Sequence, residues 1–235
     1  MSNINHQFRS IFIHIPKCAG SSMEANPPYC KGSGHRTMKD FYLNEPEAYS
    51  SYFKWCFVRN PWDRAVSAWD TCPEIKPYLK TFPEFVDALY KDRKKIQNLS
   101  DCRWGPSPLG GGAGTLAGQE GVEINLPVQR IHFLPMLSMM KVDGVVEMDF
   151  IGRFENIQQD WKKVTNLLFD RPIKLPEHNR RPNTRCQVET LPTKWSRAKT
   201  HYQQYYTHPD LVKKIADIYS EDIEAFGYTY DKFST

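Results

Sequence analysis

A lysine, a glycine and two serines follow one another in a segment that is suited to bind an anion. The segment runs Lys17-Cys18-Ala19-Gly20-Ser21-Ser22, and Pro16 separates it from a short apolar run. A glycine-containing loop ahead of a helix exposes backbone N–H groups, and the helix dipole favours negative charge there. The ammonium group of Lys17 and the serine hydroxyls add further donors. The pattern predicts a phosphate or sulfate site; the alternative is an ordinary turn with an exposed lysine.

A second cation-rich motif follows another apolar run. It reads Val58-Arg59-Asn60-Pro61-Trp62-Asp63-Arg64-Ala65-Val66-Ser67. We expect Arg59 at the end of a strand and Ser67 two turns into the following helix, on the face directed back toward that strand end. Because a planar guanidinium bonds two oxygens at once, Arg59 and Ser67 are suited to hold one phosphate from two sides. In the alternative, the two arginines of the motif form ion pairs with Asp63 or Asp70.

We expect the Lys17 motif and the Arg59 motif each to follow directly after a strand. Short apolar, β-branched runs predict strands at Ile11–Ile15 and Lys54–Val58, and a third strand is expected at Phe150–Gly152. Strands that alternate with helices predict an α/β fold with a mainly parallel central sheet flanked by helices, and such sheets bind ligands beyond the carboxyl ends of their strands. A first helix is expected to begin at Ser21 and to end before Pro27-Pro28. Further helices are expected from Pro46 to about Phe53, from Pro61 to about Cys72, and from Thr81 to about Asn98.

Two further helices are predicted from their apolar faces. One face consists of Ile157, Trp161, Val164, Leu167 and Leu168. The other consists of Leu211, Ile215, Ile218, Tyr219, Ile223 and Phe226, with Gly227 after the last turn. The tryptophans at 55, 62 and 69 are expected to pack in the core.

The length of 235 residues, without an internal repeat, predicts a single domain over residues 1–235. Seven glycines between 103 and 121 predict a long loop insertion there. No apolar stretch approaches the roughly 20 residues of a membrane-spanning helix, and the first residues lack the apolar core of a signal peptide. We therefore expect a cytoplasmic protein without a membrane span.

Charge and cysteine content narrow the classes of ligand. The net charge of +4 is too mild to imply a nucleic acid partner, and none is expected. Residues 171–199, however, hold eight Lys or Arg and two Glu, which suits either a small anionic ligand or a solvated basic loop. The six cysteines form no CxxC pair and no metal-type spacing with histidine, so we expect mostly reduced thiols and no metal site. A Cys72–Cys102 or other bridge stays open.

Taken together, the two motifs resemble those of a known enzyme family. Ile15–Ser22 resembles the 5′-phosphosulfate loop of sulfotransferases that use 3′-phosphoadenosine 5′-phosphosulfate (PAPS), and Phe57–Trp69 resembles their 3′-phosphate motif. Phe150–Asn156, Leu175–Asn179 and Tyr219–Tyr228 also match, in the order of the family. The chain looks most like the membrane-type carbohydrate sulfotransferases and their soluble bacterial relatives. The resemblance implies a single-domain sulfotransferase fold, similar to that of P-loop NTPases.

The resemblance also implies roles for individual residues. The 5′-phosphosulfate would be held by Lys17, Cys18, Ala19, Gly20, Ser21 and Ser22. Lys17 would in addition stabilise charge on the leaving phosphate oxygen, while Arg59 and Ser67 would hold the 3′-phosphate. Asn179, Arg180 and Arg181 would close over the nucleotide or meet an anionic acceptor. Cys18 departs from the family, in which threonine is more usual, but the backbone N–H is expected to do most of the binding.

Sulfuryl transfer needs an acceptor hydroxyl that attacks sulfur in line, a base that takes its proton, and cations at the leaving group. The implied acceptor is a carbohydrate or a small molecule, and no metal is required. Histidine is the natural base near neutral pH, and relatives often carry a Gly-His pair at this place, so we assign the base to His35. His132, Glu24 and Asp40 are the alternatives.

Two other functions remain open at this point. A nucleotide-dependent phosphotransferase would need a lysine after the glycines of its loop, whereas Lys17 precedes Gly20, and it would need a Mg²⁺-binding aspartate, for which Asp149 is a weak candidate. A non-catalytic nucleotide- or anion-binding protein would bind 3′,5′-adenosine diphosphate without transferring a group to any acceptor.

Overall fold

Strands and helices alternate in the computed structural model, which describes residues 3–24, 34–71, 79–97, 113–117, 123–126, 128–175 and 201–231. The strands are β1 (Ile4–Asn5), β2 (Ser10–Ile13), β3 (Phe53–Val58), β4 (Ala113–Ala117), β5 (Glu123–Leu126), β6 (Val128–Gln129), β7 (Lys141–Val142), β8 (Val145–Val146) and β9 (Phe150–Arg153). The helices are α1 (Gly20–Glu24), α2 (Met38–Asn44), α3 (Pro46–Ser51), α4 (Pro61–Thr71), α5 (Phe82–Lys91), α6 (Arg93–Gln97), α7 (Ile157–Phe169), α8 (Pro209–Ile218) and α9 (Ser220–Phe226). Short 3₁₀ helices cover Arg130–Phe133, Leu137–Met139, Phe154–Asn156 and His201–Tyr205.

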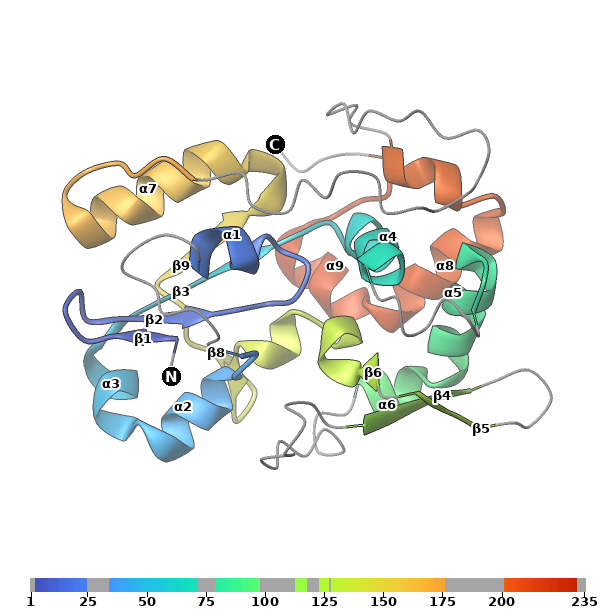
Figure 1. The fold of residues 1–235 in the computed structure, drawn as a ribbon, viewed down its shortest axis with the longest axis horizontal. Helices are drawn as coiled ribbons and strands as arrows, with labels where there is room; N and C mark the ends of the chain where they lie inside the picture. Colours follow the sequence, from blue (N-terminus) through green and yellow to red (C-terminus); the bar gives the residue numbers. More distant parts are fainter. Residues whose placement is uncertain are drawn as a thin grey trace.

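The central sheet has the order β1-β2-β3-β9. Strands β2, β3 and β9 run parallel, and the short β1 pairs with β2 in the antiparallel direction. Figure 1 shows α1 and α7 on one side of this sheet and α2 and α3 on the other. The predicted α/β fold with a mainly parallel sheet flanked by helices is therefore confirmed.

Aromatic side chains fill the space between the sheet and α7. The rings of Phe12 on β2 and Trp55 on β3 stack with centroids 4.3 Å apart, and Trp161 of α7 lies 6.0 Å from Trp55. On the opposite face of β3, the Cys56 thiol lies 3.5 Å from the Met140 sulfur. Strands buried on both faces read as continuous apolar runs, which is why the sequence pattern located them. Trp62 and Trp69 are also buried, as predicted.

The turn from β3 to α4 is fixed by Asn60. Its side-chain oxygen accepts the Trp62 N–H at 3.0 Å and the Asp63 N–H at 3.4 Å, as an N-cap residue does. Pro61 then takes the first helical position, where its missing N–H costs nothing. The Asn60 amide also donates to the Thr229 carbonyl, which attaches the end of the described chain to this turn.

Some local expectations were wrong. Ala113–Ala117 is strand β4, which pairs with β5 and β6, so the predicted loop over 103–121 is incorrect there; the rest of that stretch lies outside the described residues. Leu167 is 63% exposed because it projects about 80° away from the line of Ile157, Trp161, Val164 and Leu168 on α7. Residues 211–226 form two helices that meet at Tyr219, and residues 82–97 form two that meet at Asp92.

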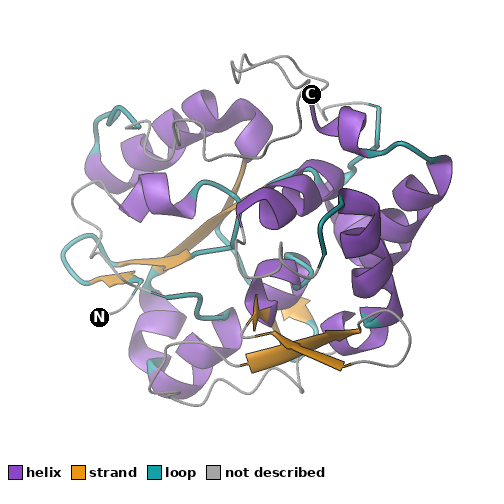
Figure 2. Cartoon of the chain, turned by 45° about the vertical axis from the view of Figure 1, so that its right-hand side comes forward, coloured by secondary structure: helices purple, strands orange, loops and turns teal. Residues whose placement is uncertain are grey.

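Helix α2 was not predicted, although its start has a sequence signature. Thr37 and Asp40 form a capping box in which each side chain accepts the backbone N–H of the other. Figure 2 shows how the helices surround the sheet. None of the helices in the described part of the chain is both long and apolar enough to cross a membrane.

Candidate active site

The loop between β2 and α1 has an unusual backbone. Lys17 and Ala19 adopt left-handed conformations, with φ of 69° and 66°, on either side of Cys18. Side chains with a Cβ rarely take up this conformation, and where they do the strain often marks a functional site. Left-handed residues that alternate with right-handed ones direct successive N–H groups to one side, which forms a concave anion site. The two left-handed residues are consistent with the predicted anion site, which stays a prediction.

Gly20 is required here by a close contact rather than by its φ angle. A Cβ at this position would lie 2.1 Å from Cδ2 of the His14 ring. His14 follows β2 and is itself held by Glu24 of α1, whose Oε1 lies 2.7 Å from Nδ1. The imidazole is thus fixed between the strand end and α1, and it sets the distance between them.

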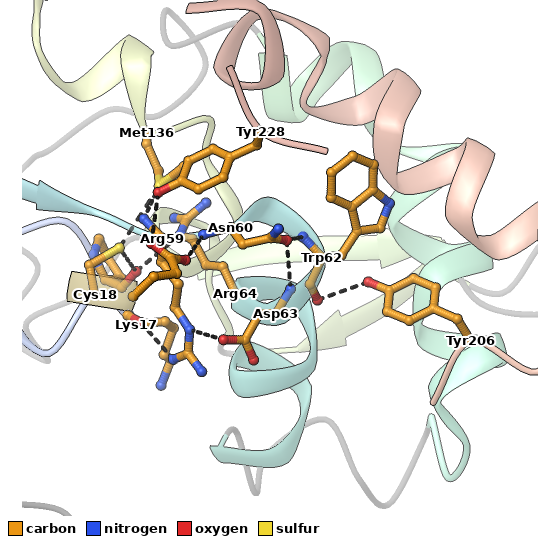
Figure 3. A network of polar contacts seen from close by, with 12 residues as sticks. Lys17, Cys18, Arg59, Asn60, Trp62, Asp63, Arg64, Met136, Tyr206 and Tyr228 are labelled. Atoms are coloured by element: carbon orange, nitrogen blue, oxygen red, sulfur yellow. Dashed lines mark hydrogen bonds and ion pairs between the residues drawn. The ribbon is translucent and has the colours of Figure 1, made fainter. Parts of the chain in front are cut away.

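Arg59 joins the loop to the second motif, as Figure 3 shows. One terminal nitrogen donates to the Lys17 carbonyl at 3.0 Å, and Nε donates to the Asp63 carboxylate at 2.8 Å. Its guanidinium lies 4.0 Å from the centre of the Phe154 ring. Burial disfavours the charge of Arg59, but the adjacent Asp63 outweighs this and raises its pKa. The predicted phosphate-binding arginine is therefore at the loop, and it also forms the ion pair with Asp63 that was the alternative.

Arg64 makes contacts of a different kind. Its guanidinium donates to the main-chain carbonyls of Pro16 at 3.0 Å, Leu134 at 2.8 Å and His132 at 3.4 Å. The alternative in which Arg64 pairs with Asp63 or Asp70 is not what the structure has: its hydrogen bonds within the described ranges go to carbonyls. This residue connects the loop to the segment that carries His132.

Lys17 reaches across to α4. Its Nζ donates to the Thr71 hydroxyl at 2.5 Å, and that hydroxyl donates to the Ser67 carbonyl at 2.6 Å. Ser67 therefore lies one helical turn from the residue that holds the Lys17 ammonium group. Thr71 was not singled out from the sequence, although its spacing of four residues from Ser67 puts both on one helix face.

Histidines gather on the other side of the loop. His35 Nδ1 lies 3.1 Å from the His14 carbonyl oxygen, and its ring lies 4.4 Å from the His14 ring and 5.3 Å from the His132 ring. A carbonyl only accepts hydrogen bonds, so the proton of neutral His35 must be on Nδ1, which leaves a lone pair on Nε2.

Burial keeps the rings of His35 and His132 neutral. It lowers the pKa of His35 to about 3, with the neighbouring His14 acting in the same direction. It also lowers the pKa of His132 to about 3, helped by the positive charges of Lys17 and Arg64. At neutral pH, His35 is thus an uncharged imidazole with a lone pair on Nε2, which is the state a general base requires.

Cys18 turns its side chain away from the loop surface. The thiol is buried 3.7 Å from the Pro16 carbonyl and 3.8 Å from the Met136 sulfur, and burial raises its pKa to about 12. Its N–H points to the Ile15 carbonyl at 3.4 Å. The replacement of the more usual threonine therefore changes packing below the loop, and the predicted contact of Cys18 with a ligand stays a prediction.

Other candidates have structural partners. Asp40 caps α2, and Glu24 binds His14. Glu155 accepts the Asn60 N–H at 2.6 Å and the Tyr228 hydroxyl at 3.1 Å, so it supports the strand end. Asn179, Arg180 and Arg181 lie outside the described residues. The structure thus brings together Lys17, Ala19, Gly20, Ser21, Ser22, His35, Arg59 and Ser67 on neighbouring elements.

Comparison with known proteins gives the family. The family model described as "Sulfotransferase family" matches residues 2–229. Carbohydrate sulfotransferase 14 of Danio rerio is 22% identical over 251 aligned residues, which cover 99% of this chain and 63% of that protein. The chain thus spans less than two thirds of the length of this relative. No solved structure matches. The order of the motifs, the parallel sheet that carries them and the match over nearly the whole length lead to one conclusion: the chain belongs to the sulfotransferase family.

Proposed function

We propose that the chain transfers a sulfuryl group from PAPS to an acceptor hydroxyl by in-line displacement. The observation that carries the proposal is the meeting, at the carboxyl end of β2, of the Lys17 loop with a neutral histidine that has a lone pair on Nε2. The first supplies positive charge for a leaving phosphate, and the second supplies a proton acceptor for an attacking hydroxyl.

On the donor side, the backbone N–H groups of Ala19, Gly20 and Ser21 and the Lys17 ammonium group would bind the 5′-phosphosulfate. Lys17 would leave Thr71 and move to the phosphate oxygen from which sulfur departs, where negative charge develops. Arg59 and Ser67 would hold the 3′-phosphate, to which the second terminal nitrogen of Arg59 would donate, while Nε and the first keep Asp63 and Lys17.

On the acceptor side, the hydroxyl oxygen would form the new bond to sulfur while the bond from sulfur to the phosphate oxygen breaks. The hydroxyl proton would pass to Nε2 of His35, and 3′,5′-adenosine diphosphate would leave. A pKa of about 3 makes a weak base in the empty site. The negative charges of bound donor would raise that pKa and so strengthen the base at the step that needs it.

The acceptor class follows from the relative. Because Danio rerio carbohydrate sulfotransferase 14 is named for carbohydrate, we propose a carbohydrate hydroxyl as the first acceptor to test, with small-molecule hydroxyls next. The test is transfer of ³⁵S from labelled PAPS to a library of both kinds. Labelled product supports the proposal, and labelled donor that stays intact with every acceptor contradicts it.

A binding experiment separates this function from its competitors. We expect 3′,5′-adenosine diphosphate to raise the thermal midpoint of unfolding more than ATP with Mg²⁺ does. A preference for ATP with Mg²⁺ would instead indicate a phosphotransferase. Binding of the bisphosphate without transfer to any acceptor would indicate a non-catalytic binding protein.

A further inference from the structure

Arg64 carries a buried positive charge with an uncommon set of partners. Its side chain is on α4, the residue is 2% exposed, and its hydrogen bonds go to three main-chain carbonyls. No carboxylate within the described ranges comes within ion-pair distance of it, whereas its neighbour Arg59 is paired with Asp63. Buried charges are normally paired, because their removal from water is costly.

The other groups around Arg64 do not neutralise it. The Cys18 thiol is uncharged at neutral pH, the Tyr219 ring centre lies 5.8 Å away, and His132 is neutral. Asp222 is the carboxyl group that interacts with it from further away, and it already accepts the N–H groups of Met136 and Leu137 at 2.8 Å each. Burial raises the pKa of Asp222 to about 6, so Asp222 is mostly ionised at pH 7 and offsets part of the charge of Arg64 without pairing with it.

The charge is directed at the loop. Nε of Arg64 donates to the Pro16 carbonyl, and that carbonyl belongs to the same peptide group as the Lys17 N–H. A cation at the oxygen end of a peptide group polarises its N–H end, and in an interior of low polarity the charge itself acts over several ångströms. Arg59 does the same one residue later, at the Lys17 carbonyl. Figure 3 shows both guanidinium groups beside Lys17 and Cys18.

We propose that Arg64 is a positioning residue for the donor: its buried charge lies beneath the Lys17 loop and favours the dianionic 5′-phosphate group there without touching it. The inference rests on the proposed function, because it concerns the same nucleotide. A role in packing alone would need the three hydrogen bonds but not the charge, and this difference can be measured.

The experiment compares two substitutions and two nucleotides by titration calorimetry. Arg64→Gln keeps side-chain N–H donors and removes the charge, whereas Arg64→Lys keeps the charge and removes the planar fork. The ligands are 3′,5′-adenosine diphosphate and adenosine 3′-monophosphate, which lacks the 5′-phosphate. Arg93→Gln is the control, because it removes one partly exposed charge on α6 that lies 3.8 Å from Asp217.

We expect Arg64→Gln to raise the Kd of the bisphosphate about tenfold to a hundredfold, the order for one charge acting through a protein interior. The Kd of adenosine 3′-monophosphate should change little, and Arg64→Lys should restore most of the affinity. Equal losses for both nucleotides, or unchanged bisphosphate binding in Arg64→Gln, would overturn the inference. Failure of the wild type to bind the bisphosphate would instead reject the proposed function, and the inference with it.

If the Arg64 variants do not fold, the variant Asp222→Asn tests the role of the Arg64 charge instead. It removes the negative charge that partly compensates Arg64 and keeps one oxygen as an acceptor. We expect it to lower the Kd of the bisphosphate several-fold without a matching change for adenosine 3′-monophosphate. An unchanged or raised Kd would count against a role for the buried charge.

Discussion

The two sides of the candidate active site differ in the charge of their side chains. On the side of α4, Arg59 and Arg64 remain charged although they are as buried as the apolar core, and both donate to carbonyls of the Lys17 loop. The second side consists of His35 and His132, which lie 5.3 Å apart and are half-buried and neutral. Of these four side chains, only the two arginines carry a positive charge.

The difference shows how one kind of environment gives two kinds of chemistry. Burial disfavours every charge, but a guanidinium starts from a pKa near 12.5 and an imidazole from about 6.5. Arginine therefore stays charged at neutral pH, particularly beside Asp63, while histidine loses its proton. The proposed reaction needs cations at the leaving group and a neutral base at the attacking hydroxyl, and these two residue types would supply them.

The largest expected effect is at the neutral side. We expect His35→Gln to lower kcat by about 10²- to 10⁴-fold, because the variant loses the proposed proton acceptor. Binding of 3′,5′-adenosine diphosphate should stay within about threefold of the wild type. The exposed His6, which contacts the Tyr52 hydroxyl at 2.9 Å, provides the control variant His6→Gln. Steady-state rates with labelled donor measure this, and full turnover by His35→Gln would remove its assignment as the base.

At the charged side, we expect Lys17→Ala to lower kcat by about 10²- to 10³-fold, since the charge on the leaving oxygen would lose its nearest cation. Lys39→Ala is the matched control, because Lys39 is exposed and lies 3.9 Å from Asp143. Single-turnover rates at saturating donor isolate this step. A loss confined to KM would mean that Lys17 binds the donor without acting on the leaving group.

Substitutions at Arg59 and Asp63 distinguish binding of the 3′-phosphate from the ion pair between these two residues. Arg59→Ala should abolish the rise in thermal midpoint that 3′,5′-adenosine diphosphate produces, because the 3′-phosphate would lose its guanidinium. Asp63→Asn removes the ion pair and keeps the guanidinium, so the nucleotide should still stabilise this variant. Stabilisation of Arg59→Ala equal to that of the wild type would leave Arg59 with the ion pair alone.

The smallest expected effect concerns stability. Unfolded histidine titrates near pH 6.5 and folded His35 near pH 3, so between these values the unfolded state binds more protons and the free energy of unfolding falls as pH is lowered. When the pH is lowered from about 7.5 to 5, we expect the free energy of unfolding of the wild type to fall by about 1–2 kcal/mol more than that of His35→Gln. The raised pKa of Asp222 acts in the opposite sense in both proteins, so the difference between them is the quantity to measure by urea unfolding. Equal losses would show that the pKa of His35 is the same in the folded and the unfolded chain.

The sequence predicted the parts of this site that depend on short segments. The strands before Pro16 and Arg59, the helix from Pro61 and the loop between them have strong local patterns, and all were located. The contacts that determine the charge states could not be predicted from the sequence, because they join residues far apart in the chain. Arg64 meets Leu134 across 70 residues, and the His14 ring needs the absence of a Cβ at Gly20, which only the folded arrangement reveals.

Other misses have local causes. The glycines between 103 and 121 favour a loop, but Ala113–Ala117 has a strand on each side, and its hydrogen bonds come from the backbone. The Thr37–Asp40 capping box is visible in the sequence and marks the start of a helix, so α2 is predictable from it.

The most direct measurement is the protonation state of His35 in the folded chain. Nitrogen chemical shifts of the imidazoles at pH 7, with His35 assigned through His35→Gln, distinguish the two neutral forms from the charged one. We expect a neutral His35 ring with the proton on Nδ1 and a lone pair on Nε2. A proton on Nε2, or a doubly protonated ring, would contradict the assignment of His35 as the base and with it the division of this site into a charged and a neutral side.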